Sequence, residues 1–169
     1  MRMDDLLCIG WKEWAKLPAL HVPLIKVKID TGAKTSALHV YNLEILKIKS
    51  KDYASFIIHP LQKNDIISRK CCCEIVGKKI VKSSNGQKEE RYMIRTPIQI
   101  GSKVWDINIT LTNRDIMHHR MLLGREAMRS IVVNPSKIFC QSRVSSKKAM
   151  LVYMQDLVGP ALKVMKGNK

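Results

Sequence analysis

The chain has 169 residues, which is enough for one packed domain and small for two. Hydrophobic residues make up 46% of it, which favours a globular core over disorder, and no apolar window is long enough to span a membrane. The 30 Lys and Arg residues outnumber the 14 Asp and Glu residues, and the formal net charge of +16 favours a polyanionic partner. Charge alone does not choose among nucleic acid, an anionic membrane and an acidic polypeptide.

The cysteines do not predict a disulfide framework. There are five of them, and three are consecutive at 71–73, where neighbouring thiols rarely bridge without strain. They also lack zinc-site spacing, since no C-x-x-C motif is present. The N-terminus has early acidic residues and no apolar stretch of signal-peptide length. We therefore expect a soluble cytoplasmic protein with reduced thiols and no membrane association.

Short strands account for most of the chain. Alternating apolar and polar residues predict strands over 24–29, 36–48, 53–61, 71–83, 91–100 and 104–113. The first strand alternates apolar with basic residues, which indicates one buried and one wet face. Asn85-Gly86, between the fourth and fifth strands, is the strongest hairpin signal in the chain.

The pattern changes after residue 120. An apolar run at 121–123 is followed by Gly124, a short helix-like segment and another strand that ends at Pro135. Many strands with one short helix near the end predict an all-β barrel or sandwich. The three tryptophans are interpreted as core residues, because aromatic residues make up only 5% of the chain and are not interleaved with basic ones.

The remaining residues form a separate unit in this interpretation. We assign residues 1–140 to one domain and residues 141–169 to a basic C-terminal tail. The tail is either partly disordered or packed on the body. Gly159-Pro160 is expected to interrupt any helix in it.

The segment DTGAKTS begins at Asp30, directly after the first predicted strand. A plain turn explains the Asp and the Gly, but not the apolar strands that enter and leave the segment directly. A phosphate-binding loop fails because Ala33 separates Gly32 from Lys34, whereas that loop needs the Gly and Lys adjacent. The third interpretation is the catalytic loop of an aspartic peptidase, in which a strand delivers an Asp into a tight turn.

A second element supports the third interpretation. IDTGA at 29–33 and LLGRE at 122–126, with a Gly-containing hairpin between them, resemble the retropepsin family of aspartic peptidases. The chain is similar in particular to bacterial retropepsin-like proteins that are often labelled ATP-dependent zinc proteases and are associated with ribosomal-modification glutamate ligases. The motifs that carry this resemblance over residues 8–140 are IGWKEW (9–14), IDTGAKTSALH (29–39), HPLQ (59–62), ERYMIRTPI (90–98), LTNRD (111–115) and MLLGR (121–125).

The resemblance implies a retropepsin-like closed barrel, one half of an acid protease, with one short helix after the LLGR strand. The residues do not support the zinc or the ATP of the label. The chain has no H-E-x-x-H motif, and its histidines show no ligand spacing beyond the adjacent His118 and His119. We expect no cofactor and no metal.

The implied mechanism needs two carboxylates that share a proton, one to activate water and one to polarise the carbonyl. The chain has a single Asp-Thr-Gly, so the second Asp is expected from a second copy in a two-fold homodimer. Asp30 then acts as acid and base, Thr31 fixes the loop, and Gly32 and Ala33 line its floor. Ala33 supplies no hydroxyl to the carboxylate, so we expect a less acidic pH optimum than in enzymes with Ser or Thr there.

The resemblance also assigns supporting and substrate-binding positions. Leu123, Gly124 and Arg125 would support the loop. In retroviral enzymes an Asp two residues after the D-T-G Gly pairs with this Arg, and here that position is Lys34, so Arg125 is expected to lack that partner. The substrate-binding candidates are Ala33, Lys34, Tyr92 and Arg95, with Tyr92 either a flap residue or a packing residue.

An acidic peptide is the preferred substrate, because Lys34, Arg91, Arg95 and Arg120 are expected near the cleft of a strongly basic chain. The family context implies a poly-α-glutamate tail or a glutamate-tailed protein. A different class of function stays open, namely a catalytically inactive basic module on the same fold that binds ribosomal RNA or an acidic protein. Nucleic acid is therefore the second choice of partner.

Overall fold

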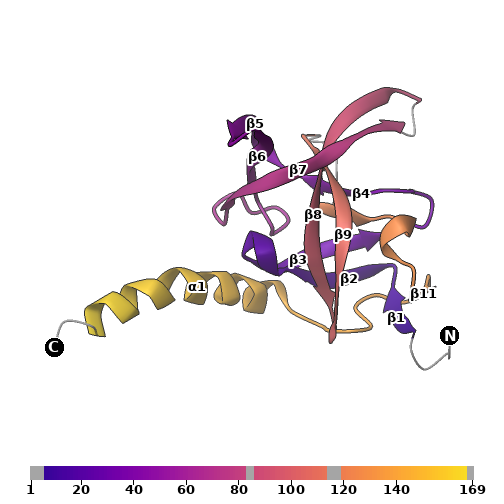
Figure 1. Ribbon diagram of the computed structural model, residues 1–169. Helices are drawn as coiled ribbons and strands as arrows, with labels where there is room; N and C mark the ends of the chain where they lie inside the picture. Colours follow the sequence, from indigo (N-terminus) through magenta and orange to yellow (C-terminus); the bar gives the residue numbers. More distant parts are fainter. Residues whose placement is uncertain (1–5, 83–85, 114–118, 167–169) are drawn as a thin grey trace.

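The computed structural model describes residues 6–82, 86–113 and 119–166, with residues 157–166 described by their backbone alone (Figure 1). The strands are β1 (Leu7–Gly10), β2 (Lys12–Leu17), β3 (Val22–Ile29), β4 (Ser36–His39), β5 (Tyr41–Ile48), β6 (Lys51–Ile58), β7 (Arg69–Lys82), β8 (Lys88–Ile100), β9 (Lys103–Thr112), β10 (Met121–Leu123) and β11 (Ile131–Asn134). Within the described residues, the helices are two 3-10 turns, η2 (Pro18–Leu20) and η3 (Arg125–Ala127), and α1 (Ser146–Lys166).

A closed ring of strands forms the body. The order is β2, β3, β10, β4, β9 and β8, and β8 pairs back onto β2 through Gln99 and Lys16. Strands β7, β6 and β5 continue the sheet outward from β8, while β1 and β11 form a separate parallel pair. This ring confirms the predicted all-β barrel. The short helix predicted after the LLGR segment is the single 3-10 turn η3.

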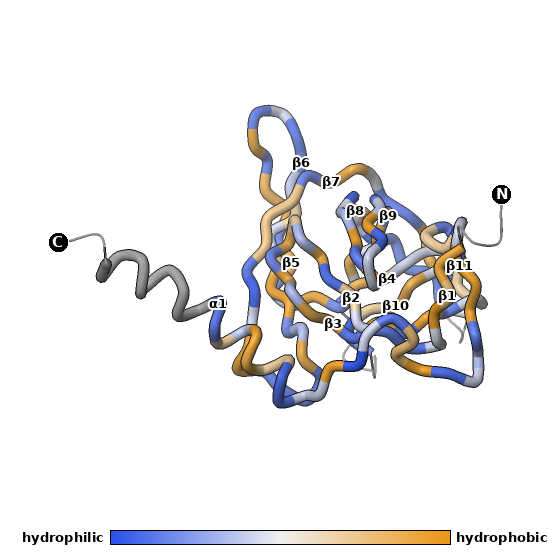
Figure 2. Tube along the Cα trace, turned by 90° about the horizontal axis from the view of Figure 1, so that it is seen from below, coloured by the Kyte–Doolittle hydropathy of each residue, from blue (hydrophilic) through white to orange (hydrophobic). Residues whose placement is uncertain are grey.

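Alternation along the strands fills the ring with aliphatic side chains. On β8 the fully buried residues Ile94, Ile98 and Ile100 point inward, and on β9 Ile107 and Ile109 do the same. Figure 2 shows the alternation of hydrophobic and hydrophilic residues along the strands of the body. A side-chain period of two is what a sheet with one buried face requires, which is why the pattern predicted these strands.

The strand predicted over 36–48 is wrong as a single element. The structure divides it at Val40 into β4, whose residues are all buried, and β5, which is mostly exposed. β4 is held inside the ring between β10 and β9, whereas β5 pairs with β6 at the edge of the sheet. Asn42 has a positive φ of 50°, so the chain changes direction at the start of β5.

The expected interruption of a C-terminal helix at Gly159-Pro160 is also wrong, since the backbone of α1 is helical to Lys166. Proline removes one intrahelical hydrogen bond, and a helix that is already nucleated by its packed first half tolerates that loss. Figure 1 shows α1 extending away from the barrel. No helix within the described residues is both long and apolar enough to cross a membrane.

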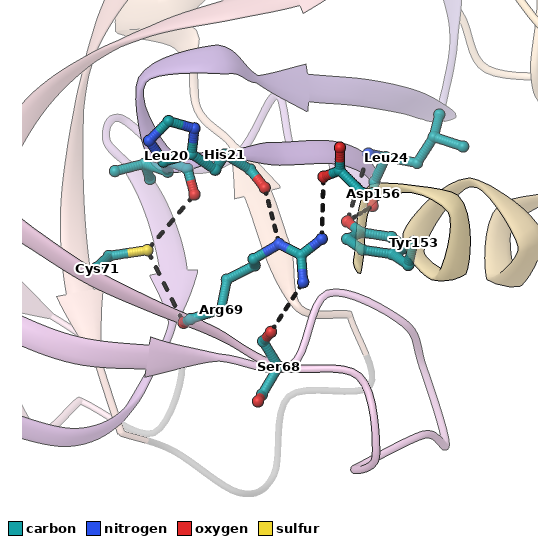
Figure 3. Close-up of polar contacts among 8 residues, drawn as sticks. All are labelled: Leu20, His21, Leu24, Ser68, Arg69, Cys71, Tyr153 and Asp156. Atoms are coloured by element: carbon teal, nitrogen blue, oxygen red, sulfur yellow. Dashed lines mark hydrogen bonds and ion pairs between the residues drawn. The ribbon is translucent and has the colours of Figure 1, made fainter. Parts of the chain in front are cut away.

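The first half of α1 is anchored on β3 (Figure 3). The hydroxyl of Tyr153, which is fully buried, donates to the carbonyl of Leu24 and accepts from its N–H at 3.4 Å. The guanidinium of Arg69 lies 4.9 Å from the centre of the Tyr153 ring, donates to the carbonyl of His21 and pairs with Asp156 at 3.1 Å. The helix therefore covers the part of β3 that precedes the candidate site.

Candidate active site

Asp30 follows the last residue of β3 and is held by backbone bonds on both sides. Its N–H donates to the carbonyl of Leu123 at 2.9 Å. Its Oδ1 accepts from the N–H groups of Gly32 and Ala33, both at 3.1 Å. Successive backbone N–H groups around one oxygen form an anion-binding nest. The carboxyl group is thus fixed in orientation and remains partly exposed.

The LLGR segment contacts this loop, at the positions to which the resemblance assigns loop support. The N–H of Gly124 donates to the Ser36 hydroxyl at 3.1 Å, and the N–H of Arg125 donates to the carbonyl of Ala33 at 2.9 Å. A Cβ at Gly124 would lie 2.5 Å from the carbonyl carbon of Thr35, which explains why a glycine stands there. Motifs 90 residues apart in sequence therefore form one unit in space.

Arg125 has found different partners from those in the retroviral pattern. Its Nη1 donates to the carbonyls of Thr31 and Gly32, both at 2.8 Å, so it holds the loop through backbone oxygens and needs no carboxylate. Lys34, which occupies the position of the missing Asp, forms an ion pair with Glu126 at 3.9 Å. In this pair the basic residue, Lys34, stands at the position where the retroviral pair has its Asp, and Glu126 is the acidic member.

Glu126 also bridges to the hairpin formed by β7 and β8. Lys79 donates to its Oε2 at 2.8 Å, and this hydrogen bond lowers the pKa of the Glu126 carboxyl despite the opposing effect of burial. The N–H of Glu126 donates to the carbonyl of Lys34 at 3.0 Å. Residues Lys34, Glu126 and Lys79 therefore connect the Asp30 loop with the hairpin.

A lysine face lies beside Asp30 that sequence reasoning did not single out. Lys26 and Lys28 alternate with buried residues of β3, so they share one face of the strand. Asp30 follows Lys28 by two residues and continues this alternation. On β2, Lys12 stands opposite Lys28 and Trp14 opposite Lys26. Burial lowers the pKa of Lys26, and the charge of Lys12 lowers it further. The basic alternation before Asp30 was the available signal, but it could not show which residues of β2 stand beside it.

The tryptophans divide between the core and this face. Trp14 is buried, Trp105 is partly buried, and Trp11 is 37% exposed, so the prediction that all three belong to the core is wrong for Trp11. The ammonium of Lys12 lies 4.9 Å from the centre of the Trp11 ring. A cation held over an aromatic face explains why Trp11 stays at the surface.

Tyr92 and Arg95 lie on β8, and their described contacts are with residues outside the Asp30 loop. The ammonium of Lys78 is 5.0 Å from the centre of the Tyr92 ring. Arg95 is exposed and pairs with Asp106 at 3.3 Å. Both stay substrate-binding predictions.

Two other arginines that were expected near the cleft have ion-pair partners within the single chain. Arg91 is buried and pairs with Glu89 at 2.8 Å. Arg120 precedes β10, at the opposite end of that strand from the Asp30 loop, where it bonds the Tyr41 hydroxyl and Asp65. The register of β7 against β8 places Arg91 opposite Lys79, whereas Arg120 lies away from the Asp30 loop, and composition gives no access to either position.

Among the described residues, no group of three or more His, Cys, Asp and Glu side chains is arranged to hold a metal ion. His118 of the adjacent histidine pair, Arg114 and Asp115 of the LTNRD motif, and Asn85 of the predicted hairpin turn lie outside the described residues. All five cysteines are free thiols, with Cys71 buried and Cys72 exposed.

Comparisons with known proteins place this geometry in a family. Residues 8–144 match the family described as "Retropepsin-like aspartic endopeptidase RimB". A protein of Shewanella pealeana named "Probable alpha-L-glutamate ligase" is 45% identical over 138 residues, which are 81% of this chain and 30% of that protein. A protein of the same name from Desulfotalea psychrophila is 39% identical over 149 residues, 88% of this chain and 32% of that protein.

A solved structure has a similar fold. The Legionella pneumophila protein Lpg0085, described as having unknown function, is 29% identical and superposes with a TM-score of 0.67 over 80% of this chain and 98% of its own. The carboxyl-bearing loop on a closed barrel, with Gly-Arg beneath it, defines the retropepsin-like class of aspartic peptidases. The chain belongs to the RimB-like family within that class. It spans about a third of the length of the curated relatives it matches.

Proposed function

We propose that this chain is an aspartic-type endopeptidase that works as a homodimer on acidic peptide tails. The observation that carries the proposal is the Asp30 loop, in which a partly exposed carboxyl group is oriented by two N–H groups and fixed from beneath by Arg125. Because the chain has a single Asp-Thr-Gly, the second carboxyl group comes from a second copy across a two-fold axis. Thr31 and Gly32 are exposed in the single chain, as residues that meet a partner across that axis would be.

The reaction follows from the chemistry of two carboxyl groups at close range, which titrate as a pair and hold one proton between them. The ionised Asp30 takes a proton from water as the oxygen bonds to the peptide carbonyl carbon. The protonated Asp30 of the other copy gives its proton to the carbonyl oxygen. When the intermediate collapses, the first carboxyl protonates the nitrogen, the C–N bond breaks, and the second carboxylate recovers its proton.

An acidic substrate is supported by the lysine face. Lys26 and Lys28 lie on β3, the strand that leads to Asp30, and Lys12 stands opposite Lys28 on β2. Like charges opposite one another on neighbouring strands destabilise a sheet. Carboxylates of a bound peptide would relieve that repulsion. Relatives named as α-L-glutamate ligases contain this region within longer chains, which suggests glutamate tails as the substrate and a glutamate ligase as a functional partner.

Incubation with a poly-α-glutamate peptide and with a glutamate-tailed protein, at several pH values and with mass spectrometry as the readout, tests this function. We expect shortened products from the natural chain and none from Asp30→Asn. Asp52→Asn, the same change on the exposed part of β6, is the matched control and should cleave normally. Cleavage that persists in Asp30→Asn would show that another group does the chemistry.

The second candidate is the catalytically inactive basic module that binds ribosomal RNA or an acidic protein. The net charge of +16 favours it as much as it favours an acidic substrate. It predicts tight RNA binding that weakens steeply with salt, as counterion release requires, and that Asp30→Asn leaves unchanged. Absence of cleavage together with such binding would select this candidate.

A further inference from the structure

A cavity of about 710 Å³ lies next to the candidate site and has no part in the chemistry described so far. Its walls come from β7, β8, β9 and η3, together with the first residues of β1 and β11 and residues 129–130. Asp30 and its loop do not line it. A cavity of this size falls within the range that binds small ligands and short peptide segments.

The floor of the cavity is apolar and rigid. The indole N–H of Trp105 donates to the carbonyl of Ala127 at 3.0 Å, which fixes the ring against η3. Val104, whose side chain lies on the opposite face of β9 from Trp105, is 58% exposed and also lines the cavity, as do Met93 and Ile131. Exposed apolar side chains in a concave surface are typical of a binding site rather than of ordinary solvent contact.

The rim of the cavity is positively charged. Its ionisable residues are Lys79, Arg95, Lys103, Asp106, Glu126 and Arg129. Both acids already have partners, since Asp106 pairs with Arg95 at 3.3 Å and Glu126 with Lys79 at 2.8 Å. The rim therefore favours a ligand that brings carboxylates, while the floor favours one that also brings an apolar side chain.

Glu126 connects the candidate site with the cavity. Glu126 lines it and is also the residue that pairs with Lys34, four positions after Asp30. A peptide chain that leaves the Asp30 loop along Lys34 would pass Glu126, whose charge Lys34 and Lys79 neutralise, and then enter the cavity. The next residue of that peptide would then contact Trp105 or Val104.

We propose that this cavity is an exosite that binds the distal part of an acidic peptide substrate through an apolar side chain flanked by carboxylates. The proposal rests on the peptidase function for its substrate class, and it adds a second binding site away from the cleaved bond. Such a site would select which acidic tails are cleaved, because a tail of glutamates alone would leave the apolar floor exposed.

Binding can be measured apart from cleavage with the Asp30→Asn protein. The probes are two labelled poly-α-glutamate peptides of equal charge, in which one distal residue is replaced by leucine or by glutamine. We expect the leucine peptide to bind several-fold more tightly, because burial of its side chain removes apolar surface from water. Val104→Glu, at an exposed position, should remove that preference without unfolding the chain.

The rim is tested by reversing charges. Lys103→Glu with Arg129→Glu should weaken the binding of both peptides by about tenfold, since each attractive contact becomes repulsive. Lys147→Glu with Lys148→Glu makes the same change in net charge at exposed positions on α1 that do not line the cavity, and should weaken binding much less. Equal binding of the two peptides, or equal effects of the two charge reversals, would overturn the exosite.

The outcomes separate this proposal from the peptidase function. If the leucine peptide binds more tightly but the natural chain cleaves no peptide, the peptidase function is wrong and the binding site is supported. Cleavage whose KM is the same for the leucine and glutamine peptides would remove the exosite and keep the function. If Val104→Glu abolishes self-association and leaves peptide binding unchanged, a second copy of the chain occupies the cavity and the proposal is wrong.

Discussion

At the scale of single residues, Gly124 joins the two halves of the candidate site. A Cβ there would lie 2.5 Å from the carbonyl carbon of Thr35 and 2.9 Å from the backbone nitrogen of Ser36, and backbone atoms cannot rotate away. Gly124→Ala should lower the free energy of unfolding by about 3 kcal/mol, the upper part of the range for overpacking. Urea denaturation measures this change.

The control for that substitution is Gly86→Ala. A Cβ at Gly86 meets nothing within 4 Å, and only its φ of +84° opposes an alanine. The expected loss is about 1 kcal/mol, the ordinary cost of a left-handed alanine. A loss at Gly124 no larger than that at Gly86 would mean that the loop moves aside freely, contrary to the rigid contact described above.

Cys71 gives a pH-dependent prediction. Burial, with a smaller effect from Cys73, raises the pKa of its thiol from 9.0 to about 12. In the unfolded chain this thiol ionises at lower pH than in the folded chain, so its contribution to stability is complete below pH 9 and is lost as the pH rises from there toward 12. Between pH 8 and pH 10 the natural chain should therefore lose more stability than Cys71→Ala.

Cys72→Ala is the matched control, because Cys72 is the neighbour of Cys71 on β7 and is exposed. It should lose stability with pH as the natural chain does. Denaturation in urea at both pH values measures the three slopes. Identical slopes for the two variants would show that Cys71 is not protected by burial, which would also make it reactive toward iodoacetamide at pH 8.

At the scale of secondary-structure elements, α1 depends on one hydroxyl. Tyr153 bonds both backbone groups of Leu24 on β3 and is fully buried. Tyr153→Phe keeps the ring beneath Arg69 and leaves those two groups without their partner, so we expect a loss of about 1–3 kcal/mol and faster proteolysis of the helix. Tyr53→Phe, on a partly exposed position of β6, should change neither.

The strands were the predictable elements, and their local pattern explains why. β8 alternates buried and more exposed residues over 94–100 and β9 does so over 104–109, so a period of two is visible without knowing the neighbours. The division at Val40 was not visible, because β4 is buried on both faces and its apolar residues run directly into those of β5. Tertiary contacts with β9 and β10 decide where that element ends.

The candidate site was likewise predictable only where local structure restricts the residue type. Asp30 and Gly124 carry their roles in short motifs, since a tight turn and a close backbone contact each restrict the residue type. The bonds from Arg125 to the carbonyls of Thr31 and Gly32 were not predictable, because carbonyl oxygens have no sequence signature. The position of Lys12 beside Lys28 likewise required the register of β2 against β3.

At the scale of the whole molecule, the proposed chemistry requires two chains. A single copy holds one Asp-Thr-Gly loop, with Thr31 and Gly32 exposed. If both copies must supply Asp30, a dimer that contains one Asp30→Asn chain is inactive. Activity of a mixture should then follow the square of the fraction of natural chain, since random pairing produces active dimers in that proportion.

Natural and Asp30→Asn chains, unfolded together and refolded as an equal mixture, should therefore show about a quarter of the activity of the same total amount of natural chain. Mixing with Asp52→Asn should leave the activity unchanged, because that exposed carboxylate on β6 has no part in the reaction. Activity that falls in simple proportion to the natural fraction would mean that each chain cleaves alone. The second carboxyl group would then have to lie within the same chain, and the single Asp-Thr-Gly loop would not account for hydrolysis.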